Sequence, residues 1–161
     1  MKILGIDPGL QVCGYAVIEA KLLDIRLIEA GVFRTDGKAE LAERLNQIAD
    51  DIEQVLKTHK PETVAVEQLY SHYNHPRTAI LMGHARGVIF QKAAASGASV
   101  RDFAATRIKK SLTGNGRATK SQMQLSIQSV LGLPEPPEPA DVADAIAIAL
   151  CCANENQFKN L

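Results

Sequence analysis

The first 35 residues hold three strand-like stretches whose connections are too short to contain a helix. Residues 3–7 form an apolar stretch that ends in an acid. Residues 12–19 and 25–35 are rich in β-branched side chains with polar residues between them. Only a few residues separate each stretch from the next, whereas a parallel crossover needs roughly a dozen. The three stretches are therefore predicted to form neighbouring antiparallel strands.

The rest of the chain alternates helical and strand patterns. Apolar side chains recur at the helical period over residues 39–58, and the β-branched stretch 63–67 follows as a strand parallel to the first. Further elements are predicted as a helix over 77–95, a strand over 98–103, and helices over 106–112, from a capping box at 119–122, and over 141–154. We expect a single α/β domain over residues 1–161, with a five-stranded mixed sheet, three antiparallel strands then two parallel, flanked by helices.

The composition is typical of a soluble domain with its own core. The 161 residues are 46% hydrophobic and 22% charged. No apolar stretch approaches the roughly 20 residues that cross a bilayer, and no signal peptide pattern opens the chain, so we expect a cytoplasmic protein with no membrane partner. Cys13, Cys151 and Cys152 lack the paired spacing of a zinc site and are expected to be buried free thiols.

A formal net charge of zero conceals a strong asymmetry along the chain. Residues 68–120 carry nine Lys or Arg side chains and one acid, Asp102, which leaves a net charge of +8. The remaining segments carry nine basic and seventeen acidic side chains, a net charge of −8. A solvated surface is one explanation, but one-sided charge over such a length favours an anionic partner such as nucleic acid.

Gly83 and Gly87 lie four residues apart in the predicted helix over 77–95. Each costs roughly 1 kcal/mol relative to Ala in a helix interior, so close packing against another element is expected there. That element is either a second copy of the chain, across a dimer seam, or the protein's own sheet.

Four acids occupy positions typical of a catalytic site. Asp7 and Glu67 each end a predicted strand, and Asp141 and Asp144 lie three residues apart on one side of the last helix. Each has an ordinary structural interpretation as well. Asp7 before Pro8 suits a turn, Glu67 suits a solvated strand end, and the last two acids suit a helix N-terminus.

Taken together, the four acids predict a metal site. Open α/β sheets place their chemistry at the carboxyl ends of strands, and carboxylates that converge there repel one another unless a divalent cation balances them. Oxygen-only ligands favour Mg²⁺, with Mn²⁺ as a substitute, and two such ions about 4 Å apart stabilise the attacking and leaving oxygens of a phosphoryl displacement. Water is then the nucleophile, which suits a chain without a Ser-His-Asp or Cys-His pattern.

Several motifs together resemble one known family. They are Ile3-Leu4-Gly5-Ile6-Asp7-Pro8-Gly9 with Gly14-Tyr15, Val66-Glu67-Gln68 with Tyr70, Gly83-His84-Ala85-Arg86-Gly87, Gly114-Asn115-Gly116 with Lys120-Ser121-Gln122, and Asp141-Val142-Ala143-Asp144-Ala145-Ile146-Ala147. In order and spacing, and over nearly the whole chain, these resemble the crossover (Holliday) junction endodeoxyribonuclease RuvC family of the ribonuclease H-like superfamily.

The resemblance implies a ribonuclease H-like fold, a homodimer, and Mg²⁺-dependent nicking of opposing strands of a four-way DNA junction. It implies that Asp7, Glu67, Asp141 and Asp144 bind two metal ions and carry the catalysis. A branch-migration complex, RuvA–RuvB, is a further partner that it suggests.

The resemblance also implies roles in DNA binding. Tyr70 would stack on a base, and Lys109 and Lys120 would lie near the scissile phosphate. Arg77 and Arg86 are further DNA-binding candidates. Two other functions remain open at this point: a ribonuclease H acting on RNA–DNA hybrids, and a junction-binding protein without catalysis. An actin-like ATPase is excluded because that fold needs two such domains.

Overall fold

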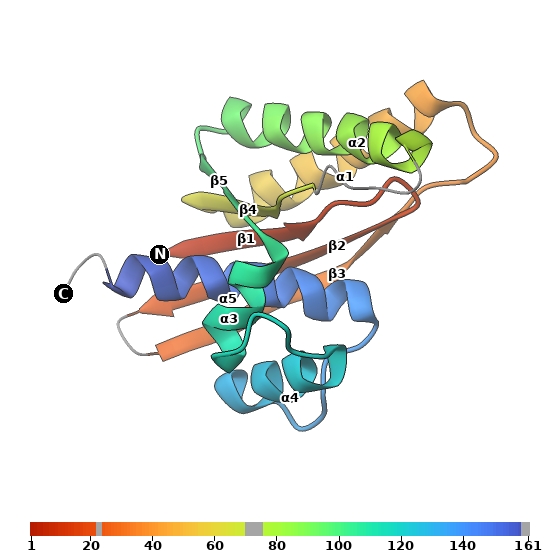
Figure 1. Cartoon of the computed structure of the whole chain (residues 1–161). Coiled ribbons are helices and arrows are strands. Elements are labelled where there is room, and N and C mark those ends of the chain that lie inside the picture. The colour runs from red at the N-terminus through yellow and green to blue at the C-terminus, as the bar shows by residue number, and fades with distance from the viewer. Residues whose placement is uncertain (22–23, 70–75, 159–161) are drawn as a thin grey trace.

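A five-stranded mixed sheet forms the centre of the computed structural model, which describes residues 1–21, 24–69 and 76–158 (Figure 1). The strands are β1 (Lys2–Asp7), β2 (Val12–Lys21), β3 (Asp24–Arg34), β4 (Thr63–Glu67) and β5 (Ser99–Phe103), in the spatial order β3-β2-β1-β4-β5. Strands β1, β2 and β3 pair antiparallel, and β4 and β5 run parallel to β1. The predicted fold class is confirmed.

In the described part of the chain, five helices flank the sheet: α1 (Leu41–His59), α2 (Pro76–Ala95), α3 (Ala105–Thr113), α4 (Lys120–Leu131) and α5 (Ala140–Phe158). The predicted capping box is present, because the Gln122 backbone N–H donates to the Thr119 hydroxyl and the Thr119 backbone N–H donates to the Gln122 side chain. Helix α5 extends four residues beyond its predicted end at residue 154. None of the described helices is both long and apolar enough to span a bilayer.

The helices form two layers, with α1 and α2 on one face of the sheet and α3, α4 and α5 on the other (Figure 1). Alternation along β1 assigns its side chains to these faces. Leu4 and Ile6 pack under α1 and α2, whereas Ile3 packs under α5. Gly5 and Asp7 share the parity of Ile3, so the acid at the end of β1 lies on the α5 face.

Helix α5 lies unusually close to β1 and β2 because two strand glycines face it. A Cβ at Gly5 would meet the Ala145 carbonyl oxygen at 2.3 Å, and one at Gly14 would meet the Asp141 carbonyl oxygen at 2.0 Å. On the helix side, Ala145 and Ala149 keep the gap narrow. The helix backbone therefore rests almost directly on the sheet.

The three cysteines are buried and free, as predicted. Burial raises the pKa of the Cys13 thiol to about 12 and that of Cys152 to about 11. They are held as thiols and act as small apolar core residues.

Gly83 and Gly87 do not pack on the sheet. The buried stripe of α2 consists of Ala85, Ile89 and Ala93, and among the described residues a Cβ at either glycine would meet nothing within 4 Å beyond its own helix. The alternative in which these glycines pack against the protein's own sheet is therefore wrong. Both lie on the outward face of α2.

Gly14→Ala is expected to displace the start of α5. The added Cβ would collide with backbone rather than with a flexible side chain, so relief requires movement of the helix. The free energy of unfolding, measured by urea titration, should fall by about 1–3 kcal/mol. In the control Gly37→Ala, the new Cβ meets only the end of the Gln11 side chain at 3.1 Å, and a change within about 0.5 kcal/mol is expected. Equal losses in both variants would contradict the close approach.

Candidate active site

Two of the predicted acids lie side by side at the carboxyl edge of the sheet. Asp7 ends β1 and Glu67 ends β4, and the parallel register pairs Ile6 with Val66 immediately before them. Both acids have the parity of the side chains that face α5. The sheet thus presents two carboxylates toward the start of that helix.

The other two acids come from the first turns of α5. Asp141 and Asp144 follow the helix start at Ala140. Gly14, which pairs with Asp7 across β1 and β2, lies directly beneath the Asp141 backbone. The close approach of α5 to the sheet therefore brings all four predicted acids to one edge of the molecule.

Three of these carboxylates have a raised pKa. Burial raises the pKa of Asp7 to about 7, and the charges of Asp144, Glu67 and Asp141 add to the effect in that order. Burial also raises the pKa of Glu67 and of Asp144. Such a cluster is electrostatically unfavourable by itself and is relieved by a cation.

The donor set fits a hard divalent ion, although the side chains do not form a closed cage as they stand. Within the ranges that the structure describes, no three His, Cys, Asp or Glu side chains have the spacing of a formed metal site. Carboxylate oxygens are nevertheless the ligands that Mg²⁺ and Mn²⁺ prefer. The charges of Glu67, Asp141 and Asp144 all raise the pKa of Asp7, so all three lie within electrostatic reach of it.

Two lysines line the same site. Lys120 Nζ lies 3.7 Å from Asp144 Oδ2, and the charges of Lys109 and Lys120 act to lower the pKa of Glu67. Together with Glu67 and Asp144, these lysines line a cleft of about 200 Å³ that has Met123 at its apolar wall. Acids and ammonium groups side by side suit a phosphodiester, since the acids can hold cations and the lysines can contact phosphate oxygens.

Arg86 lies behind the site, on α2. Its Nε donates to the Glu67 carbonyl oxygen at 3.3 Å and its Nη2 donates to Asp102 Oδ2 at 2.8 Å, while the guanidinium stacks 4.2 Å from the centre of the Phe90 ring. The guanidinium thus ties the end of β4 to β5 and α2. Its predicted contact with DNA stays a prediction.

Arg77, a further DNA-binding candidate, is exposed at the start of α2 and is not among the residues that line the cleft beside Glu67. Tyr70 lies outside the described residues.

Sequence reasoning missed Asp102 as the partner of Arg86 and missed Gly5 and Gly14. A glycine inside a strand, which often marks a close backbone approach, was the available signal.

The family model for "Crossover junction endodeoxyribonuclease RuvC" matches residues 3–152. The chain belongs to the RuvC family. It is 54% identical to the RuvC of Rhodopirellula baltica over 149 residues, which cover 92% of this chain and 84% of that protein. Identity to the RuvC of Heliobacterium modesticaldum is 43%, over 96% of this chain and 94% of that one.

A solved RuvC structure has the same fold. The T. thermophilus RuvC in complex with a Holliday junction substrate superposes with a TM-score of 0.93 at 34% identity, and the match covers 99% of this chain and 96% of that one. The ribonuclease H-like fold implied by the sequence resemblance is confirmed. RuvC family members are metal-dependent nucleases, which agrees with the chemistry of the four acids.

Without metal, stability is expected to fall as the pH rises from about 4 to about 7. The Asp7 carboxyl has a pKa near 3.8 when unfolded and about 7 when folded, so within this window the folded state holds a proton that the unfolded chain has lost. Urea titrations in a chelator should show this fall in the free energy of unfolding, and Asp7→Asn should make it shallower. Mg²⁺ should restore more stability to the wild type than to the variant. The same pH slope in both proteins would contradict this prediction.

Arg86→Met is expected to loosen Glu67 while keeping the packing on Phe90. Loss of both hydrogen bonds should raise the Mg²⁺ concentration needed for half-maximal nuclease activity by roughly tenfold, as outer hydrogen bonds to metal ligands typically do. Lys92→Met, on the same helix but paired with Glu53, is the control and should leave it unchanged. If Arg86→Met instead reduces only the salt dependence of DNA binding, the arginine is a phosphate contact.

Proposed function

We propose that this chain is a structure-selective endonuclease that resolves four-way DNA junctions by metal-dependent hydrolysis of phosphodiester bonds. One observation carries the proposal: the acids at the ends of β1 and β4 and at the start of α5 meet at one edge, beside Lys109 and Lys120. Membership of the RuvC family supplies the substrate class.

Asp7, Glu67, Asp141 and Asp144 would hold two Mg²⁺ ions, with Mn²⁺ as a substitute. Bound ions would supply an activated water and neutralise charge on the leaving oxygen. The carboxylates must rotate inward to reach a common centre. An ion bound at that centre would reduce the repulsion that Asp144, Glu67 and Asp141 exert on Asp7.

The basic residues would contact different parts of the bound DNA. Lys120 Nζ lies 3.7 Å from Asp144 Oδ2, and this long ion pair would leave the lysine able to bind a phosphate oxygen instead. Lys109 lines the same cleft. Tyr70 would stack on a base near the branch point, and Arg77 and Arg86 would contact backbone phosphates around it. The net charge of +8 over residues 68–120 supports binding of an anionic partner.

We propose a homodimer formed through the outward face of α2. Gly83 and Gly87 leave open space on that face, and Ile80 is 62% exposed at its N-terminal end. Small residues on both helices would let their backbones approach closely and would offset the cost of two helical glycines. A two-fold axis there gives two active sites for two opposing strands.

A branch-migration complex of the RuvA–RuvB type is a proposed partner, since it acts on the same four-way DNA. We propose that the enzyme acts where this DNA lies, in the cytoplasm of bacteria like those that carry its relatives. The whole chain, residues 1–161, would act as one nuclease domain.

Asp7→Asn is expected to abolish cleavage of a synthetic four-way junction in Mg²⁺, with a loss of about 1,000-fold or more, because a central ligand is removed. Junction binding, measured in Ca²⁺ by gel shift, should stay within about threefold of wild type. Asp24→Asn, an exposed acid paired with Arg26, is the control and should cleave normally. Duplex DNA and an RNA–DNA hybrid complete the assay. Preferential cleavage of the hybrid would indicate a ribonuclease H instead, and full activity of Asp7→Asn would remove Asp7 from the mechanism.

Replacing both Gly83 and Gly87 by Leu is expected to separate the dimer. Bulky side chains would hold the two helices apart, although Leu favours the helix more than Gly does. Sedimentation should report a monomer at concentrations where the wild type is dimeric. Ala42→Leu, on the exposed face of α1, is the matched control and should stay dimeric. An intact dimer in the double variant would place the seam elsewhere.

A further inference from the structure

A second hollow lies at the edge of the sheet opposite the acids. It has a volume of about 500 Å³ and lies between the C-terminal ends of α1 and α2. Lys60 and Pro61 at its border come just before β4, whereas Glu67 ends that strand. Since β4 rises about 3.3 Å per residue, the hollow and the catalytic edge are separated by at least about 13 Å.

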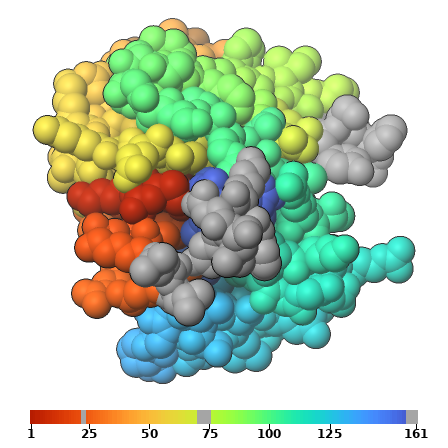
Figure 2. All heavy atoms as spheres, turned by 90° about the vertical axis from the view of Figure 1, so that its left-hand side faces the viewer, coloured from red at the N-terminus to blue at the C-terminus, as the bar shows by residue number. Residues whose placement is uncertain are grey.

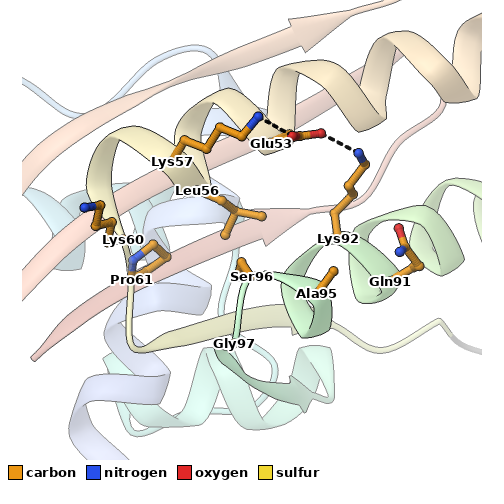
Figure 3. Close-up of a pocket in the computed structure, with 10 residues that line it drawn as sticks. All are labelled: Glu53, Leu56, Lys57, Lys60, Pro61, Gln91, Lys92, Ala95, Ser96 and Gly97. Carbon is orange, nitrogen blue, oxygen red and sulfur yellow. Dashed lines mark hydrogen bonds and ion pairs between the residues drawn. The ribbon is translucent and has the colours of Figure 1, made fainter.

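Figure 2 looks onto this edge, where the yellow end of α1 and the start of β4 lie beneath the green end of α2. Figure 3 shows the side chains that line the hollow. Leu56 lies at its centre and is 4% exposed, with Pro61 buried beside it. Ala95 and Gly97 border it from α2 and the residues that follow, and a Cβ at Gly97 would have open space around it. These residues give the hollow an apolar part, and Gln91 and Ser96 add polar groups to its lining.

Three ammonium groups surround this apolar part. Lys57 and Lys60 come from the end of α1, and Lys92 reaches across from α2 (Figure 3). Among the described residues that line the hollow, Glu53 is the one acid; it pairs with both Lys57 and Lys92, and these two lysines lower its pKa to about 2. Nearby Glu62 is engaged by the N-terminal ammonium group, 3.7 Å away. The rim therefore keeps an excess of positive charge.

The positive charge of this rim is an exception to the net negative charge of the segments that supply most of its lysines. Outside residues 68–120 the chain carries a net charge of −8, yet two of the three lysines belong to those acidic segments. The dipoles of α1 and α2 favour cations at their C-terminal ends, but they do not require an apolar hollow between them. The volume falls in the range of roughly 300–1,000 Å³ that is typical of ligand sites.

We propose that this hollow is a docking site for an acidic peptide segment of another protein, with an apolar side chain of that segment seated against Leu56. The complementary charges would lie on Lys57, Lys60 and Lys92, and the buried apolar contact would supply the anchor. A flat phosphate backbone has no apolar group to place on the apolar part of the hollow, so the lining favours a peptide over DNA. Because the hollow lies at the far edge of the sheet, a partner can bind while the junction occupies the acids.

The test is a selection of random twelve-residue peptides on the full chain, with four-way junction DNA in excess and Ca²⁺ in place of Mg²⁺, so that the catalytic edge is occupied but inactive. Survivors are counter-selected on the double variant Lys57→Glu/Lys60→Glu. Acidic residues around a central Leu, Ile, Met or Phe are expected. Failure to recover peptides, or peptides that lack either feature, would overturn the proposal.

One selected peptide, labelled with fluorescein, then measures affinity by anisotropy. Binding should weaken about tenfold or more in Lys57→Glu/Lys60→Glu. It should weaken similarly in Ala95→Trp, which fills the hollow without changing the charge. The control Lys21→Glu/Lys38→Glu makes the same charge change at two exposed lysines elsewhere and should stay within about twofold. Circular dichroism confirms that each variant is folded.

The outcomes are separable from those of the nuclease assay, because peptide binding needs neither metal nor cleavage. If peptide binding weakened equally in both double variants, the effect would be due to net charge alone, and the proposed docking site would be wrong. Unchanged binding in Ala95→Trp would overturn the apolar anchor. Displacement of the peptide by junction DNA would show that DNA occupies the hollow, and would also overturn the proposal.

Discussion

The close contact between α5 and the sheet is the constraint on which the rest of the structure depends. A helix normally stands off a sheet by the length of two layers of side chains, whereas here Gly5 and Gly14 remove one layer and the alanines of α5 thin the other. Asp141 and Asp144 therefore reach the strand ends that carry Asp7 and Glu67. Rigid packing along β1 and β2 holds them there, as a site of this kind requires.

The same contact concentrates negative charge in a partly buried place. Burial and mutual repulsion raise the pKa of Asp7 to about 7, so the metal-free protein bears an electrostatic cost at neutral pH. Lys109 and Lys120 offset part of it, and divalent ions can offset the remainder. Arg86, bound to the Glu67 carbonyl oxygen and to Asp102, restrains the strand end against the repulsion. The lysines and Arg86 thus help the folded state to tolerate the acids, and the repulsion that remains favours the binding of cations.

The sheet separates three surfaces that can act at the same time. Its carboxyl edge holds the acids, the outward face of α2 carries the two open glycines, and the opposite edge carries the lysine-rimmed hollow (Figure 1). The proposed dimer seam on α2 would leave the acids accessible at the carboxyl edge. The proposed docking site lies at the opposite edge, so a partner bound there would not cover the acids.

The sequence alone determined the element order, the antiparallel start of the sheet and the four acids, because strand periodicity, short connections and strand-end acids are local signals. It also marked the capping box at Thr119. It could not choose the side of α2 on which Gly83 and Gly87 lie, since that depends on which face the sheet buries. The bonding of Arg86 to Glu67 and Asp102, and the descent of α5 onto Gly5 and Gly14, join residues far apart in the chain. Only tertiary packing brings such residues into contact, so only the structure decided them.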